Sequence, residues 1–184
     1  MNICVFCSCS PIDDETLSCV RELGYRLGCA GNSLVFGAFG EGLMGAIADG
    51  FQEAGAKIYG VAPKVLVDAG RAVHPGCDRV IKTISLAERK AAMIELSDAI
   101  IAAPGGIGTL DEVFSVLAMD ITKELDMPVV LYNHDGFFDE LMSMLGHMQE
   151  DGFIRRPLEG LIESAGSIDA VCELVQKAGT QAAS

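Results

Sequence analysis

The densest cluster of glycines in the chain directly precedes a carboxylate. The segment from Pro104 to Glu112 reads PGGIGTLDE and leads from an apolar run into a long amphipathic stretch. Its three glycines are Gly105, Gly106 and Gly108. Glycines at the start of a helix let backbone N–H groups approach an anion, and the helix dipole favours negative charge there. Thr109 adds a hydroxyl and Glu112 a carboxylate, so the pattern predicts a phosphate-binding turn beside an acid in the first helical turn.

The same segment has a purely structural alternative. Thr109 and Glu112 have the spacing of a capping box, in which Thr109 caps the helix and Glu112 bonds back to a backbone N–H. A capping box accounts for the threonine and the glutamate. It does not account for three glycines in the four residues before Thr109, so we favour the ligand-binding interpretation.

Two basic residues lie upstream, on a predicted helix over residues 86–96. Arg89 and Lys90 follow an apolar run, so the start of their helix is expected at the same end of a sheet as the glycine turn. Met93, four residues after Arg89, shares its face. Cations at that end would supply the charge that an anionic ligand needs in an acidic chain. Taken alone, the Glu-Arg-Lys run is more typical of a solvated surface, and that alternative stays open.

A second glycine-rich turn, GEGLMG over residues 40–45, fits G-x-G-x-x-G between a predicted strand and helix. Gly42 and Gly45 would permit either a phosphate close to the backbone or tight packing of the helix, and the pattern does not separate these roles. A dinucleotide site also needs an acid near the end of the following strand. That strand ends in VAPK over residues 61–64, without an acid, so we do not expect NAD.

Short apolar runs alternate with longer amphipathic stretches along the whole chain, as in repeated βαβ units. We predict strands over residues 3–7, 33–37, 57–62, 78–84, 98–103, 128–132 and 161–163. We predict helices over residues 13–29, 43–54, 86–96, 109–125, 137–149 and 168–177. Continuous apolar strands indicate a parallel sheet covered on both faces. The expected fold is a Rossmann-like, doubly wound, three-layer α/β/α domain, whose ligands bind beyond the carboxyl ends of the strands.

Length and charge limit the organisation and the partners. With 184 residues, we expect one nucleotide-binding domain over residues 1–178 and a flexible tail over 179–184. The formal net charge of −13 disfavours nucleic acid or an anionic membrane as partner. The first residues do not resemble a signal peptide, and no apolar run reaches membrane-spanning length. Seven cysteines without a regular framework indicate reduced thiols, and hence a cytoplasmic protein.

Cysteines and lysines in the chain suggest a metal, redox or pyridoxal site. Cys4, Cys7 and Cys9 suggest a metal or redox site, but Cys4 and Cys7 point to opposite faces of a strand, and no further ligands complete a tetrahedral set. We therefore expect no metal and no cofactor. A pyridoxal enzyme would need a Schiff-base lysine, and no motif supports the two lysines near the expected site. These are Lys64 and Lys90.

The PGGIGTLDE motif, with Arg89 and Lys90 upstream, resembles the Lonely Guy family of cytokinin riboside 5′-monophosphate phosphoribohydrolases, often labelled lysine decarboxylases. The resemblance runs over nearly the whole chain, and GLMG over residues 42–45 supports it. It implies a homodimer that hydrolyses AMP or N6-substituted AMP to free base and ribose 5-phosphate. It places the catalytic pair on Arg89 and Glu112 and the phosphate-binding turn on Gly105, Gly106, Gly108 and Thr109.

Several positions depart from the family pattern. The usual Gly-Ser-Ser after the first cysteine is here Ser8-Cys9-Ser10, in a segment over residues 7–11 that is expected at the site. The usual three glycines after the second strand are Gly37-Ala38-Phe39, and the usual Met-His before Glu-Arg-Lys is Leu86-Ala87. A phenylalanine in place of glycine would narrow the pocket or move the turn. These departures keep an alternative open, namely a non-catalytic carrier of a nucleotide or cofactor on the same fold.

Overall fold

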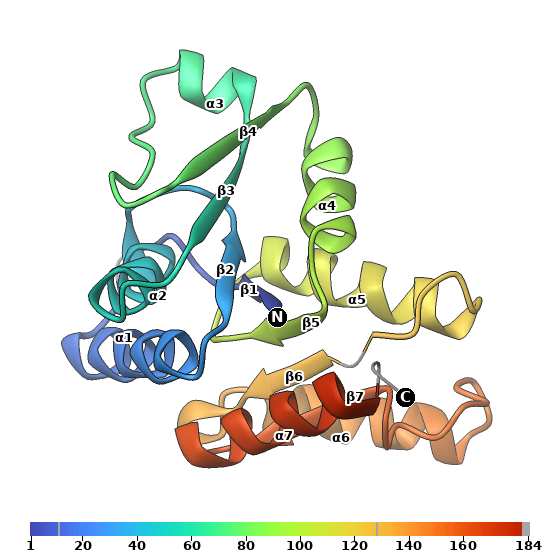
Figure 1. Ribbon diagram of the computed structural model, residues 1–184. Helices are drawn as coiled ribbons and strands as arrows, with labels where there is room; N and C mark the ends of the chain where they lie inside the picture. The colour runs from blue at the N-terminus through green and yellow to red at the C-terminus, as the bar shows by residue number, and fades with distance from the viewer. Residues whose placement is uncertain (11, 128, 182–184) are drawn as a thin grey trace.

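The computed structural model describes residues 1–10, 12–127 and 129–181, without side chains for 179–181. Seven strands form one parallel sheet in the order β4-β3-β2-β1-β5-β6-β7 (Figure 1). They are β1 (Asn2–Phe6), β2 (Ser33–Phe36), β3 (Ile58–Pro63), β4 (Arg79–Thr83), β5 (Ala99–Ala102), β6 (Val129–Tyr132) and β7 (Ile162–Ala165). The expected doubly wound parallel sheet is confirmed, with its topological switch between β1 and β5.

Helices cover both faces of this sheet, which gives three layers in a single domain. They are α1 (Asp14–Cys29), α2 (Gly42–Glu53), α3 (Lys64–Asp68), α4 (Leu86–Glu95), α5 (Ile107–Ile121), α6 (Asp139–Glu150) and α7 (Ile168–Gln181), with a short 3₁₀ turn at His134–Gly136. Helices α1, α2 and α7 pack on one face, and α4, α5 and α6 on the other (Figure 1).

The alternation of side chains along the strands explains the two cores. Ile3 and Val5 of β1 belong to the core beneath α1 and α2, whereas Cys4 and Phe6 belong to the core beneath α4 and α5. Period-two alternation sends successive side chains to opposite faces, and apolar residues at both parities therefore require helices on both sides. All four side chains are buried, which anchors β1 at the centre of the sheet.

Helix α5 differs from its expected bounds at both ends. It begins at Ile107, because Gly106 adopts an extended backbone and acts as the N-cap, two residues before the expected start. It ends at Ile121 rather than residue 125. Lys123 takes a left-handed φ of 62°, and its backbone N–H donates to the carbonyl of Asp120. The backbone N–H of Glu124 donates to the carbonyl of Met119. This pair of bonds is a Schellman motif, which terminates a helix.

Smaller differences lie at connections. The connection over residues 63–77, for which the sequence predicts neither helix nor strand, contains α3. Helix α7 continues to Gln181 instead of ending at residue 177, so the expected tail begins inside a helix, and its last residues, 182–184, lie outside the described part of the chain. Residue 128, the expected start of the sixth strand, and residue 11 also lie outside it.

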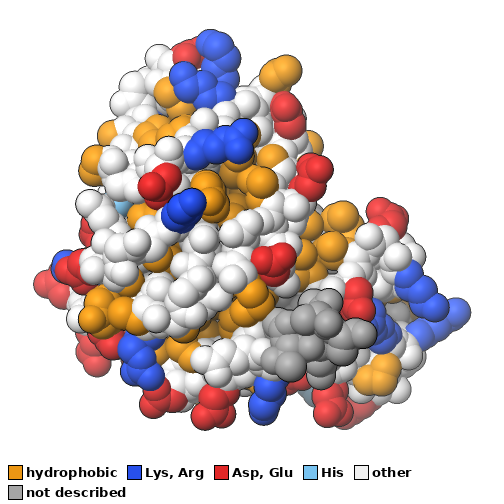
Figure 2. All heavy atoms as spheres, in the orientation of Figure 1, with side chains coloured by type: hydrophobic (Ala, Val, Ile, Leu, Met, Phe, Trp, Pro, Cys, Tyr) orange, Lys and Arg blue, Asp and Glu red, His pale blue; other side chains and the backbone are white. Residues whose placement is uncertain are grey.

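Both signs of charge appear on the face drawn in Figure 2. Lys and Arg side chains gather at the upper end of the view, over α3 and β4, whereas Asp and Glu predominate at the lower left, over α1. Basic side chains are thus present near the carboxyl ends of β2 and β3, in spite of the net charge of −13. In the described part of the chain, no helix is both long enough and apolar enough to cross a membrane.

Candidate active site

A cavity of about 290 Å³ lies at the carboxyl edge of the sheet, where the turns after β1, β2 and β5 meet. This is the position at which open α/β sheets bind ligands. The segment after β3 and the start of α4 complete its walls. Its lining residues are Cys7, Ser8, Cys9, Ser10, Phe39, Met44, Leu66, Arg71, Leu86, Arg89, Gly106, Gly108, Thr109 and Glu112.

A buried arginine–glutamate pair lines this cavity. Nη1 of Arg89 on α4 donates to Oε1 of Glu112 on α5 at 3.1 Å, and Arg89 Nε donates to the Val61 carbonyl at 3.0 Å. The side chains of Arg89 and Glu112 are only 11% and 9% exposed. The alternative of a solvated surface cation is therefore wrong for Arg89. The bond leaves Oε2 of Glu112 without a hydrogen-bond partner among the described residues.

The guanidinium of Arg89 fits against a glycine that directly follows β2. A Cβ atom placed on Gly37 would lie 1.9 Å from Nη2 of Arg89, far inside contact distance. No residue with a side chain can occupy this position while Arg89 keeps its place. The carbonyl, the carboxylate and the bare glycine backbone together fix the guanidinium in one orientation.

Burial changes the acid–base behaviour of Glu112. Desolvation raises the pKa of Glu112 from its ordinary 4.5 to about 7, although the positive charge of Arg89 opposes the change. A carboxylate that loses its water is less stable as an anion, and the nearby cation recovers only part of this loss. At neutral pH the group is thus poised between its two protonation states, which is typical of catalytic carboxyl groups.

The start of α5 is open towards the cavity. Its N-cap is Gly106, which has no side chain to accept the first N–H groups of the helix. A Cβ on Gly106 or on Gly108 would meet no protein atom within 4 Å, so neither glycine is needed for packing. Both line the cavity, and their lack of side chains keeps the helix N-terminus accessible to an anion.

Thr109 and Glu112 do not form the capping box that their spacing permits. Thr109 is the third residue of α5 and caps nothing, and Glu112 lies beyond the first turn, where it bonds to Arg89 instead of a backbone N–H. Both expectations, a Thr109 cap and a first-turn Glu112, are therefore wrong. A capping box therefore does not explain why Thr109 and Glu112 occur at this spacing. Both side chains line the cavity.

The expected phosphate-binding glycines separate into two kinds. Gly105 is a packing residue, since a Cβ there would lie 2.1 Å from Oγ1 of Thr109. Gly42, with φ of 55°, approaches the backbone of residues 9 and 10, and Gly45 approaches the Gly40 carbonyl. Gly42 and Gly45 border a separate hollow between α1 and α2 and not the cavity of Arg89.

The remaining expected site residues differ in their positions. Ser8 lines the cavity, and its carbonyl accepts a hydrogen bond from Met44 N at 3.2 Å. Lys90 lies outside it, where Nζ bonds both carboxylate oxygens of Asp111 at 2.9 and 2.8 Å. Met93 is 1% exposed and packs in the core beneath α4.

The sequence did not single out several cavity residues. Phe39 was noted only as a departure from glycine, and it lines the cavity with 2% of its surface exposed. Arg71 lies in the long connection after β3, and its Cζ is 4.2 Å from the centre of the Phe39 ring. A long connection in a compact domain is often functional, which was the one available signal for Arg71.

The cysteines near β1 and the lysines near the cavity have different surroundings. Cys4 of β1 and Cys7, the residue after β1, are buried in the cores on opposite faces of the sheet, and burial raises the pKa of both thiols. Among the described residues, no group of three His, Cys, Asp or Glu side chains could hold a metal ion. Lys64 pairs with Asp68, and no described lysine lines the cavity.

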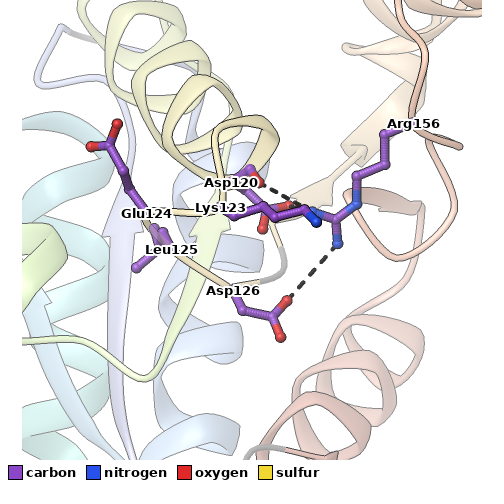
Figure 3. A pocket seen from close by; sticks show the side chains of 6 residues that line it. All are labelled: Asp120, Lys123, Glu124, Leu125, Asp126 and Arg156. Carbon is purple, nitrogen blue, oxygen red and sulfur yellow. Dashed lines mark hydrogen bonds and ion pairs between the residues drawn. The ribbon is translucent and has the colours of Figure 1, made fainter.

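A larger hollow of about 390 Å³ lies at the other end of α5 (Figure 3). There Nη1 of Arg156 donates to the carbonyl of Asp120 at 3.2 Å and to its Oδ2 at 2.8 Å, and Asp126 lies at 3.9 Å from Nη2. Asp120 is 1% exposed, so its carboxylate is buried at this end of the helix. This hollow has the larger volume of the two, but it lies at the amino edge of the sheet, away from the Arg89–Glu112 pair. Arg156 stabilises the helix end there.

The sheet order and the buried pair at its carboxyl edge define a Rossmann-like α/β protein with a cleft suited to a small anionic ligand. A family model described as possible lysine decarboxylase matches residues 44–175. Cytokinin riboside 5′-monophosphate phosphoribohydrolase LOG5 of Arabidopsis thaliana is 35% identical over 176 residues, which cover 95% of this chain and 75% of the plant protein. The chain belongs to this family, and the resemblance to the Lonely Guy proteins is confirmed.

A bacterial relative supports the same family, and a solved structure supports the fold. The cytokinin riboside 5′-monophosphate phosphoribohydrolase of Mycobacterium tuberculosis is 36% identical over 152 residues, covering 83% of this chain and 81% of the relative. The Moco carrier protein of Chlamydomonas reinhardtii superposes with a TM-score of 0.75 at 22% identity, over 98% of both chains. At that identity the carrier supports the fold alone.

Proposed function

We propose that the chain hydrolyses the N-glycosidic bond of a nucleoside 5′-monophosphate, AMP or an N6-substituted AMP, to free base and ribose 5-phosphate. The observation that carries the proposal is the buried Arg89–Glu112 pair beside an uncapped helix start lined by glycine. The names of the Arabidopsis and Mycobacterium relatives, both phosphoribohydrolases, support the same reaction.

In the proposed reaction the bond between the ribose C1′ and the base nitrogen breaks, and its electron pair leaves with the base. Positive charge develops on the ribose, as in other glycoside hydrolyses. Water adds its oxygen to C1′ as a hydroxyl group, and the one proton that it loses neutralises the departing base. A preorganised carboxylate beside C1′ would stabilise the developing charge, and such a group typically contributes about 100- to 1000-fold in rate.

The residues divide this work according to their contacts. The free N–H groups at the start of α5, next to Gly106 and Gly108, would hold the phosphate together with Thr109. Glu112 would use its unpaired oxygen towards the ribose or the attacking water. Arg89 already donates to Val61 and Glu112, so it acts mainly by holding the Glu112 carboxylate in place and stabilising its charged form.

Two other functions fit less well. A carrier of nucleotide or cofactor, as the name of the Chlamydomonas relative suggests, would need the open glycines but not a buried carboxyl with a pKa near 7. A lysine decarboxylase, as the family description reads, would need a lysine at the cavity to hold pyridoxal. Lys64 and Lys90, the candidates, are engaged with carboxylates outside it.

The proposed enzyme works as a homodimer formed along α5. One side of α5 is buried in the core, yet the other side exposes Ile107, Phe114 and Ile121. Each of these residues follows the previous one by seven positions, about two helical turns, so the three form one stripe along the helix. A helix that is apolar on both sides is normally covered, and a second copy of the chain is the occupant that the family resemblance implies. The free state of all seven cysteines supports a reducing, cytoplasmic location.

The test is incubation of the purified chain with AMP and with N6-isopentenyl AMP, with free base and ribose 5-phosphate followed by chromatography. We expect base release from at least one substrate and a loss of about 100-fold or more in Glu112→Gln. Calorimetry and circular dichroism should show that this variant still binds AMP and is folded. Tight AMP binding without release by the unaltered chain would contradict the enzyme and favour the carrier.

A further inference from the structure

The cavity contains a second arginine, which the proposed mechanism does not use. Arg89 has its guanidinium occupied by Val61, Glu112 and the backbone of Gly37. Arg71, in contrast, makes one ion pair, from Nη2 to Oε2 of Glu41 at 3.1 Å, and a side-chain contact with Cys9 in the cavity wall. Glu41 is 57% exposed, and an ion pair in that environment contributes little to stability.

The ring of Phe39 covers one side of Arg71. Its centre lies 4.2 Å from Cζ of Arg71, a cation–π contact, and the ring itself is buried. Both residues line the cavity. With one side of the guanidinium on the ring, the opposite side is the one available to a ligand. Phe39 stands where the family pattern has glycine, so this chain has a support for Arg71 that glycine would not provide.

The segment that carries Arg71 is held firmly by backbone contacts. Arg71 N donates to Leu66 O at 3.1 Å on one side, and on the other Phe39 and Val73 form an antiparallel bridge. His74 N donates to Ala38 O at 2.8 Å, and the His74 ring bonds Asp49 Oδ1 at 3.1 Å. A side chain on a fixed backbone loses less conformational entropy when it binds a ligand.

The order of the strands places this arginine away from the phosphate end of the cavity. The glycine turn follows β5 and Phe39 follows β2, and β1 lies between these strands. Neighbouring strands are about 4.8 Å apart, which separates the two ends by roughly 10 Å. A nucleotide with its phosphate at the start of α5 and its ribose at Glu112 would extend its base towards Phe39 and Arg71.

We propose that Arg71 is a further substrate-contacting residue, which stacks its guanidinium on the base of the bound nucleotide while Phe39 supports it from behind. The inference rests on the proposed function, since it takes a nucleoside monophosphate as ligand. Planar guanidinium groups stack on aromatic faces, and lysine does not replace them in this role. Arg71 thus determines affinity for the base, whereas the helix N-terminus determines affinity for the phosphate.

The test compares two ligands that differ in the base. AMP and ribose 5-phosphate share the phosphate and the ribose, and their binding is measured by calorimetry in a Glu112→Gln background that prevents turnover. Arg71→Met should weaken AMP binding about tenfold or more and change ribose 5-phosphate binding less than about twofold. Arg71→Lys should restore only part of the AMP affinity. Arg79→Met, on β4 and outside the cavity, is the matched control and should change neither.

Each other result has a distinct meaning. Equal losses for AMP and ribose 5-phosphate would overturn the inference and place Arg71 on the phosphate. Unchanged binding of both, with an unchanged melting temperature, would make Arg71 a solvated side chain. In the active chain, Arg71→Met should raise KM for AMP about tenfold and leave kcat within about twofold. Absence of AMP binding before any change at Arg71 would contradict the proposed function itself, whereas the first two results contradict only the stacking.

Discussion

Gly37 and Arg89 are in direct contact, and the absence of a side chain at Gly37 determines where the guanidinium lies. A Cβ on Gly37 would be 1.9 Å from Nη2 of Arg89 and 3.1 Å from its Cζ. The glycine directly follows β2 and the arginine belongs to α4, so the contact joins the turn after β2 to a helix, two elements whose positions are seen in Figure 1. Through Arg89, this contact also fixes the carboxylate of Glu112.

Gly37→Ala should therefore inactivate the enzyme without abolishing its fold. The new methyl group would displace the guanidinium and break its bond to Glu112, and a misplaced catalytic group typically costs about 100-fold in rate. Base release from AMP measures the effect, and circular dichroism checks the fold. A variant with normal kcat would show that Arg89 can move without consequence, and the proposed role of the pair would be wrong.

The two kinds of glycine at the site predict two kinds of defect. Gly106→Ala and Gly108→Ala place a methyl group in the open cavity and should reduce kcat/KM by about tenfold or more, with little change in melting temperature. Gly45→Ala would bring a methyl group to 2.5 Å from the Gly40 carbonyl and should destabilise the fold by about 1–3 kcal/mol.

Gly146→Ala, in α6, is the matched control for these variants, because a Cβ there also meets nothing within 4 Å. It should keep full activity and gain up to about 1 kcal/mol of stability from helix propensity. Thermal unfolding and steady-state kinetics on all four variants separate the two defects. Full activity in both Gly106→Ala and Gly108→Ala would contradict ligand binding at the start of α5.

The elements follow from local signals in the sequence, whereas the cavity walls do not. Apolar runs and their spacing predict the central strands, and the glycine turn with its following acid predicts Glu112, because these signals lie within one segment. The contact of Gly37 with Arg89 and that of Phe39 with Arg71 join segments distant in the chain. No spacing rule encodes such contacts, since they depend on the order of the strands.

Competition between a local pattern and a tertiary contact explains the wrong prediction of a cap at Thr109. The spacing of Thr109 and Glu112 satisfies the capping-box pattern, but Gly106 begins the helix earlier and the buried Arg89 binds the glutamate. Tertiary electrostatics thus overrides a local preference. The burial of Arg89 was not predictable from the sequence either, because the Glu-Arg-Lys run around it resembles a solvated surface.

The raised pKa of Glu112 predicts how the rate depends on pH. Because burial raises this pKa to about 7, the charged form that the mechanism needs is formed as pH rises through 7. The value of kcat/KM for AMP should increase between pH 6 and 8 and then level off. The substrate phosphate also titrates near pH 6. With a phosphorothioate analogue, which titrates at lower pH, kcat/KM should still increase near pH 7. A kcat/KM that instead falls as pH rises would mean that Glu112 acts as an acid.

The same pKa has the opposite effect on stability. Its folded value of about 7 lies above the ordinary 4.5, so the folded state binds the proton more tightly than the unfolded state. The resulting stabilisation is complete below pH 4.5 and is lost as pH rises through about 7. Denaturant unfolding should show this decline, of the order of 3 kcal/mol, in the natural chain and not in Glu112→Gln. Parallel pH profiles of the two proteins would contradict a raised pKa at Glu112.

The proposed dimer predicts that a charge on the exposed stripe of α5 separates the subunits. Phe114 is 38% exposed and lies at the middle of this stripe. In a two-fold symmetric dimer, the interface would bury Phe114 of both subunits. Phe114→Glu should raise the dissociation constant of the dimer by about 100-fold or more. Tyr25→Glu is the matched control, because Tyr25 is an aromatic residue of 40% exposure on α1, away from the stripe.

Sedimentation velocity over a range of concentrations measures this constant. We expect the natural chain and Tyr25→Glu to sediment as dimers and Phe114→Glu to sediment as a folded monomer. Because Ile107 belongs both to the stripe and to the glycine turn, loss of the dimer should also lower kcat/KM for AMP. A natural chain that is monomeric at every concentration would contradict the dimer, whereas a dimer that survives Phe114→Glu would place the interface elsewhere on the molecule.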